Sequence, residues 1–144
     1  MKNNFLLIIF LTFLFQQLHA EDLNIQSSTI TIDKKTKITI FKDDVVATDI
    51  KNNVFSSNYA EYDKKLNLLV SKGKTTVLTS EGFFLTGKDI VFDNKNKIIK
   101  SDQPGTLTDL EKNEIYLDKF EYSIENNFFK SSGKIKIIDN NKNS

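Results

Sequence analysis

The feature that most constrains this chain is an internal repeat of fixed period. Four segments follow one another at equal spacing, and each begins with a large apolar residue: "IDKK" (32–35), "YDKK" (62–65), "FDNK" (92–95) and "YSIE" (122–125). We call the common step from 32 to 62, 92 and 122 the repeat period. A fixed period indicates that one small unit is built several times along the chain. Four units, which start near residues 23, 53, 83 and 113, cover nearly all of the sequence after residue 20.

Other apolar positions keep the same phase. Two residues before each segment start stand Ile30, Ala60, Ile90 and Phe120. Six residues after each segment start stand Ile38, Leu68, Ile98 and Phe128. A further column consists of Ile25, Phe55, Leu85 and Ile115. We expect these columns to share one inner face, because apolar side chains that recur in register usually pack against each other.

Each unit has the sequence pattern of strands joined by turns. "GFFLTGKDIVF" (82–92) is rich in β-branched and aromatic residues, and "DNKNK" (93–97) is typical of a turn. Leu85 and Ile90 are separated by an odd interval that contains Gly87, so a β-bulge at Gly87 would place both on the inner face. No helix is predicted after residue 20.

The fold class predicted is all-β: an antiparallel, two-sheet twisted jelly-roll or sandwich built from about four 30-residue strand repeats. About ten short strands without long linkers indicate one domain, over residues 21–139. Such a sheet must bury its apolar face by folding over on itself. A solenoid of stacked units would also do this.

The first 20 residues have the pattern of a secretory signal peptide. Lys2 precedes the uncharged apolar run "FLLIIFLTFLF" (5–15), and "LHA" (18–20) ends in a small residue. An uncleaved membrane anchor is the alternative, but the run is shorter than the roughly 20 apolar residues of a spanning helix. We therefore expect residues 1–20 to be removed on export. Residues 140–144 are expected to form a disordered tail.

Composition excludes several classes of function. The only His, His19, lies in the signal peptide, and the chain has no Cys and no Arg. After removal of Lys2, 19 lysines balance 19 acidic residues, so nucleic-acid binding is disfavoured. A zinc site lacks its ligands, serine nucleophiles lack a His base, and disulfides cannot form. We expect no metal and no cofactor.

The remaining candidate motifs favour structural roles. "SKGKTT" (71–76) lacks the earlier glycine of a phosphate-binding loop and a following helix. Asp33, Asp63 and Asp93 stand where turns are expected, which favours turn-forming Asp over paired catalytic carboxylates. Calcium binding at "FDNKNK" (92–97) is disfavoured by its lysines. The protein is therefore not expected to be an enzyme.

Two segments resemble the OstA-like family of periplasmic lipopolysaccharide transport proteins, which includes LptA, LptC and the N-terminal domain of LptD. They are "SNYAEYDKKLNLLVSKGKTTV" (57–77) and "LTGKDIVFDNKNKII" (85–99). The shared elements are Ala-Glu-Tyr-Asp at 60–63, Gly73 and Leu-Thr-Gly-Lys-Asp at 85–89. Their order and phase, over most of residues 45–138, carry the resemblance.

The resemblance implies a V-shaped jelly-roll whose apolar interior shelters the acyl chains of lipid A in the periplasm. It also implies edge-strand pairing with other lipopolysaccharide-transport proteins at the inner and outer membrane, and possible head-to-tail self-association. The residues implied in lipid contact are Ile30, Ile32, Ile38, Phe55, Tyr62, Leu68, Leu85, Ile90, Phe92, Ile98, Leu107, Ile115, Phe120, Tyr122, Phe128 and Ile135. The absence of Arg removes the best clamp for a lipid phosphate.

Three alternatives stay open at this stage. The columns could form a dry core, which would make the chain a structural β-repeat or an interaction module. The chain could be a shortened relative of the LptD N-terminal domain in outer-membrane assembly. A carbohydrate-active enzyme on a β-scaffold is a third, less favoured alternative.

Overall fold

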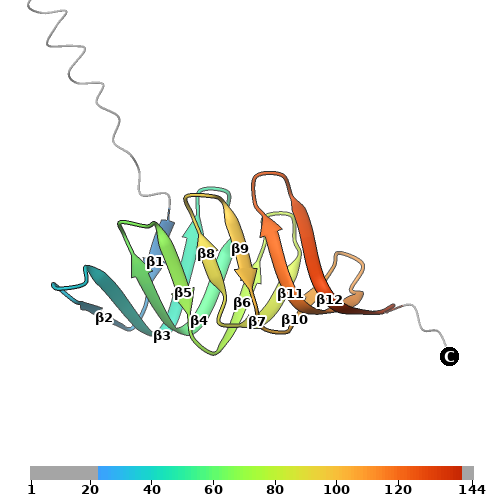
Figure 1. The fold of residues 1–144 in the computed structure, drawn as a ribbon, viewed down its shortest axis with the longest axis horizontal. Coiled ribbons are helices and arrows are strands. Elements are labelled where there is room, and N and C mark those ends of the chain that lie inside the picture. The colour runs from blue at the N-terminus through green and yellow to red at the C-terminus, as the bar shows by residue number, and fades with distance from the viewer. Residues whose placement is uncertain (1–22, 141–144) are drawn as a thin grey trace, which may run out of the picture.

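The computed structural model describes residues 23–140, which form twelve strands joined by turns (Figure 1). The strands are β1 (Leu23–Gln26), β2 (Thr29–Ile32), β3 (Ile38–Asp49), β4 (Val54–Asp63), β5 (Leu68–Ser71), β6 (Lys74–Leu78), β7 (Phe84–Lys88), β8 (Val91–Asp93), β9 (Ile98–Ser101), β10 (Gly105–Thr108), β11 (Glu114–Ser123) and β12 (Phe128–Ile138). No residue of this range lies in a helix. The predicted signal peptide (1–20) lies outside the described residues.

All twelve strands belong to one antiparallel sheet that folds into two layers. The four long strands, β3, β4, β11 and β12, contribute one half to each layer. The first layer also contains β2, β5, β8 and β9, and the second layer also contains β1, β6, β7 and β10. β4 shows the division, because residues 60–63 pair with β5 whereas residues 54–57 pair with β6. The predicted all-β, two-layer antiparallel fold is confirmed.

The two layers are joined along one side of the molecule, where the long strands bend. In β3 the register shifts between Lys42 and Val45, and the two aspartates between them have positive φ. In β12 the bend contains Gly133, whose φ is 99°. A Cβ atom at Gly133 would lie 2.6 Å from a carboxylate oxygen of Asp118, so both the backbone angle and the space require glycine there.

The turns at the free ends of the first layer recur with the repeat period, as predicted. Their last residues have left-handed backbone angles: Lys37, Asn67, Lys97 and Asn127. Asp33, Asp63 and Asp93 open three of these turns, and each carboxylate accepts a hydrogen bond from a backbone N–H two or three residues later, at 2.8–2.9 Å. The aspartates therefore hold turns, which confirms the structural interpretation of these carboxylates.

A second family of turns, which was not predicted from the sequence, closes the free ends of the second layer. Residues 49–53, 79–83 and 109–113 each close with a backbone hydrogen bond of 2.9–3.1 Å from their first residue to the carbonyl of their fifth. The side chains of Asp49 and Asp109 also accept the backbone N–H of Asn53 and Asn113. These turns repeat with the same period as the first family.

The β-bulge predicted at Gly87 is wrong. Gly87 lies in β7 in regular register with Thr75, and the change of phase occurs at Asp89, whose φ is 49°. There the chain leaves β7 in the second layer and enters β8 in the first layer. Leu85 and Ile90 are both buried, as predicted, because they reach the common core from opposite layers.

Candidate functional site

The inner face of the first layer is a continuous row of large side chains. Successive register partners across the row are Tyr62, Leu69, Phe92, Ile99, Tyr122 and Phe129. The Phe129 ring lies 6.0 Å from the Phe120 ring and 6.2 Å from the Tyr122 ring, measured between centroids. Alternate residues of a strand point to opposite faces of the sheet. This register therefore places all six side chains on the same face.

The inner face of the second layer carries a matching row. Its members are Ala47, Phe55, Val77, Leu85, Leu107 and Ile115. The two rows pack into one apolar core in which these side chains are buried, except that Tyr62, Phe129 and Ile115 are half-buried. The interior between the layers is therefore filled with side chains.

Nine of the predicted lipid-contact residues belong to this core. Buried are Phe55, Leu85, Ile90, Phe92, Leu107, Phe120 and Tyr122. Tyr62 and Ile115 are half-buried and pack against the same cluster. Their inward orientation follows from strand alternation and the repeat period, as the sequence indicated. Lipid contact by these residues stays a prediction.

The column Ile38, Leu68, Ile98 and Phe128 does not face the core, so that prediction of orientation is wrong. These residues pair with Asp63, Asp93 and Ser123, on the outer face, and Phe128 is exposed. The hairpin turns have four residues, so residue 62 pairs with residue 69, not with residue 68. A step of six residues across such a turn therefore changes the face of the sheet.

The true inner-face partners in these hairpins differ from the predicted ones. They are Leu69, Ile99 and Phe129, each one position after a predicted residue. Leu69 and Ile99 are buried. The signal was present in the sequence, because "LL", "II" and "FF" offer two adjacent apolar residues at every one of these places.

The inner face is left uncovered at both ends of the molecule. Ile30 and Ile32 in β2 are register partners of Phe41 and Thr39, and their exposed fractions are 55% and 66%. In β12, Ile135 and Ile137 have exposed fractions of 54% and 65%. β2 and β12 lie at opposite ends of the long axis (Figure 1). We call these two pairs of isoleucines the end faces.

The same ends carry unpaired strand edges. β1 and β2 pair only with β3, and β12 pairs only with β11, among the strands of residues 23–140. Each of the three strands therefore has one edge of backbone N–H and C=O groups without a strand partner. Such edges are templates for pairing with another chain.

The side of the molecule opposite the bends is closed by contacts between turns, which we call the seam. The Lys51 ammonium donates a hydrogen bond of 3.0 Å to the Ile124 carbonyl. The Asn127 side-chain amide donates one of 3.1 Å to Glu81. Both contacts join a turn of the second layer to the β11–β12 turn of the first layer. The seam therefore includes hydrogen bonds between polar groups near solvent, and the buried Ile124 lies beneath them.

Buried polar groups inside the fold have partners. Ser71 Oγ donates to the Ile90 carbonyl at 3.2 Å and accepts the Ile90 N–H at 2.9 Å, and Thr75 donates to the same Oγ at 2.7 Å. Tyr122 donates its hydroxyl proton to Asn127 at 3.2 Å, and burial raises the pKa of this phenol. Tyr122 therefore stays neutral, with its polar end at the seam.

Residues 23–140 contain no cluster of three or more His, Cys, Asp or Glu side chains that could hold a metal ion. In the same range, no helix has the length and apolar character needed to cross a membrane. The candidate site consists of the apolar inner face and its two exposed end faces.

Comparison with solved structures identifies a similar fold. No protein-family model and no curated protein matches the sequence. The structure is similar to LptH from Pseudomonas aeruginosa, described as the LptA homologous periplasmic component of the conserved lipopolysaccharide transport device. The TM-score is 0.64 at 14% sequence identity, and the match covers 81% of this chain and 93% of that chain. The chain therefore has the LptA-like fold.

Proposed function

We propose that this chain is a periplasmic lipopolysaccharide-binding transport protein that shelters lipid A acyl chains against its inner face. The observation that carries the proposal is the pair of end faces. Ile30 and Ile32 at one end, and Ile135 and Ile137 at the other, continue the inner face beyond the packed core and are more than half exposed. On an LptA-like jelly-roll these apolar ends favour contact with alkyl chains.

The role of the inner face in this proposal is contact and not catalysis. Aliphatic and aromatic side chains accept alkyl chains without leaving polar atoms unpaired. Buried side chains fill the interior, so we infer that the seam opens when acyl chains enter beyond the end faces. Opening breaks the hydrogen bonds of the seam, each worth about 1 kcal/mol net in a solvent-accessible place. It also exposes apolar core side chains, and the alkyl chains would cover this surface again.

The unpaired edges support the second part of the proposal, which concerns partners. We infer that β1 and β2 at one end, and β12 at the other, pair with transport proteins at the inner and outer membrane or with a second copy of this chain. Pairing of this kind adds main-chain hydrogen bonds and joins the apolar end faces of two molecules. The inner faces of successive molecules would then form one continuous path.

Native mass spectrometry of protein purified from a lipopolysaccharide-making host tests the proposal. We expect a population with one acylated glycolipid bound and an increase in that population after lipid A is added. A protein that stays empty in both conditions would support the alternative, a β-repeat module with a dry core.

A further inference from the structure

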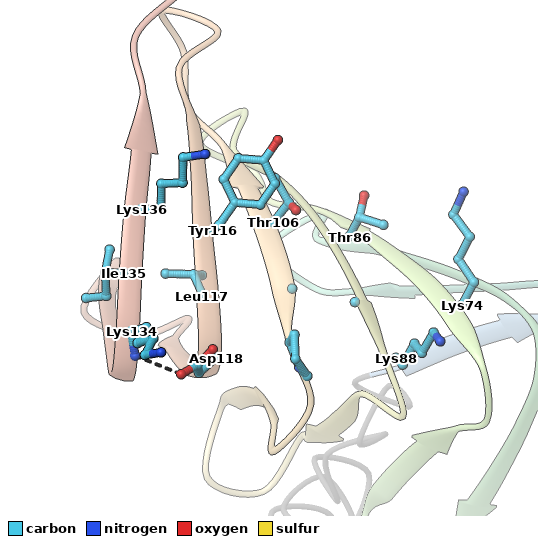
Figure 2. Close-up of a pocket in the computed structure, with 13 residues that line it drawn as sticks. Lys74, Thr86, Lys88, Thr106, Tyr116, Leu117, Asp118, Lys134, Ile135 and Lys136 are labelled. Atoms are coloured by element: carbon cyan, nitrogen blue, oxygen red, sulfur yellow. Dashed lines mark hydrogen bonds between the residues drawn. The ribbon is translucent and has the colours of Figure 1, made fainter.

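A concave cleft lies on the outer face of the second layer, behind the apolar core (Figure 2). Its volume is about 710 Å³, within the range of small-ligand sites, and strands β6, β7, β10, β11 and β12 form it. Four side chains cross it in one row, since each is the register partner of the next: Thr86, Thr106, Tyr116 and Lys136. Leu117, the neighbour of Tyr116, is buried on the other side of the sheet.

Four lysines surround the cleft: Lys74, Lys88, Lys134 and Lys136. Lys74 and Lys88 are direct register partners, so two like charges stand opposite each other. None of the four has an ion-pair partner among residues 23–140. Like charges held opposite each other repel, so this arrangement favours a bound anion.

One carboxylate lines the same cleft, and it already accepts a hydrogen bond from the protein backbone. Asp118 accepts the backbone N–H of Lys134 at 2.8 Å (Figure 2). The lining holds four ammonium groups and one carboxylate, and a second carboxylate, that of Glu114, lies against the Tyr116 hydroxyl. The cleft thus has a local excess of positive charge. The lysines are therefore concentrated at this cleft, although basic and acidic residues are equal in number over the chain after residue 20.

The rest of the lining combines hydroxyl groups and an aromatic ring with apolar residues, among them Pro104 and the end-face residue Ile135. Thr86 and Thr106 offer hydroxyl groups that both donate and accept hydrogen bonds. Tyr116 donates its own hydroxyl proton to Glu114 at 2.6 Å, which fixes the ring and raises the pKa of the phenol. A fixed, partly exposed aromatic ring offers a flat apolar surface beside the charges.

We propose that this cleft binds a phosphorylated saccharide. The lysines would hold the phosphate as separate point charges, the role that Lys fills where Arg is absent. The threonines and Tyr116 would hold the sugar ring. The source of this ligand is either the saccharide part of a glycolipid or a free sugar phosphate. The cleft lies outside the core, so the proposal does not depend on lipid chains entering the protein.

Isothermal titration of the full exported chain tests this with three probes that carry no acyl chain: a deacylated phosphorylated oligosaccharide from lipopolysaccharide, glucosamine 6-phosphate and inorganic phosphate. We expect both saccharides to bind more tightly than phosphate, with an affinity that falls as salt is raised. Tighter binding of the oligosaccharide identifies the glycolipid as the source, and equal binding identifies the free sugar phosphate. Phosphate that binds as well as the saccharides overturns the proposal.

Matched variants locate the site. Lys74→Gln with Lys88→Gln should lower saccharide affinity about tenfold, as expected for loss of charge-assisted contacts. Lys34→Gln with Lys35→Gln removes the same charge from an exposed turn and should leave the affinity unchanged. Tyr116→Ala should weaken saccharide binding and leave phosphate binding unchanged. Equal losses in both lysine pairs, or tighter binding of single-stranded DNA than of either saccharide, would refute the assignment.

Discussion

The ammonium group of Lys51 donates a hydrogen bond of 3.0 Å to the carbonyl of Ile124, a residue 73 positions further along the chain. This contact, with that between Asn127 and Glu81, closes the side of the molecule where the two layers are not joined by strands. The apolar core lies directly behind it, since Ile124 is itself buried. The proposed function therefore predicts that the seam opens when an alkyl chain enters the core.

Locking the seam should block lipid capture. The chain has no cysteine, so Glu81→Cys with Asn127→Cys can be joined by a short, cleavable thiol crosslinker. We expect the crosslinked protein to bind less lipid A in a fluorescence displacement assay, and cleavage of the linker to restore binding. The uncrosslinked double variant is the control. Unchanged binding while the linker is intact would mean that acyl chains do not pass the seam.

Replacement of the end-face isoleucines should weaken self-association without unfolding the protein. Ile30→Asp with Ile32→Asp adds charge to side chains that are already more than half exposed. Head-to-tail contact would then bury two carboxylates, which is costly without partners. Sedimentation velocity at increasing concentration should show less association than in the parent chain. Leu66→Asp, at an exposed turn residue, is the control and should associate normally.

Asp49 should contribute more stability than its counterpart Asp109. Both carboxylates accept two backbone N–H groups and one Asn amide in the same turn geometry. Asp49 is buried, so Asp49→Ala leaves unpaired polar groups inside the protein and should lower the free energy of unfolding by about 2–3 kcal/mol. Asp109→Ala, in a more exposed turn, should cost less. Urea denaturation of both variants measures the difference, and equal losses would contradict the effect of burial.

Stability should fall in acid, in part through Asp93. Burial raises the pKa of Asp93. Hydrogen bonds from the backbone and side chain of Asn96, together with the charge of Lys100, lower the pKa by more than burial raises it, so the net shift is downward. A lowered folded-state pKa contributes stability above the unfolded value of about 3.9, and this contribution is lost as the pH falls through the folded pKa. Thermal denaturation midpoints should therefore decline below about pH 4.

Asp93→Asn provides the comparison for this acid effect. The variant removes the titrating group, so its midpoint should depend less steeply on pH in the acid range than that of the parent chain. A parent-like slope in Asp93→Asn would show that this carboxylate does not carry the effect.

The repeat period was enough to predict the fold class, the first family of turns and about half of the core. It failed at Leu68, Ile98 and Phe128 because orientation beyond a turn depends on the number of turn residues. Both members of "LL", "II" and "FF" are apolar, so composition alone does not distinguish the inner residue. Register, which forms only when the strands pair, decides it.

Other features lie beyond local sequence. The seam joins residues that are far apart in the chain, and the lysine cleft gathers Lys74, Lys88, Lys134 and Lys136 from three strands. The change of phase at Asp89 could be predicted only if β7 and β8 were known to belong to different layers. Each of these features is produced by the folding of one sheet over itself.

Site-specific photo-crosslinking tests the central claim most directly. A photoreactive phenylalanine derivative would replace Ile32 or Ile135 on the end faces, and Leu66 or Leu110 at exposed turns, in cells that make lipopolysaccharide. The proposed function predicts crosslinks to lipopolysaccharide from the two end-face positions and none from the two turn positions. Crosslinks from Leu66 and Leu110 but not from Ile32 and Ile135 would contradict it.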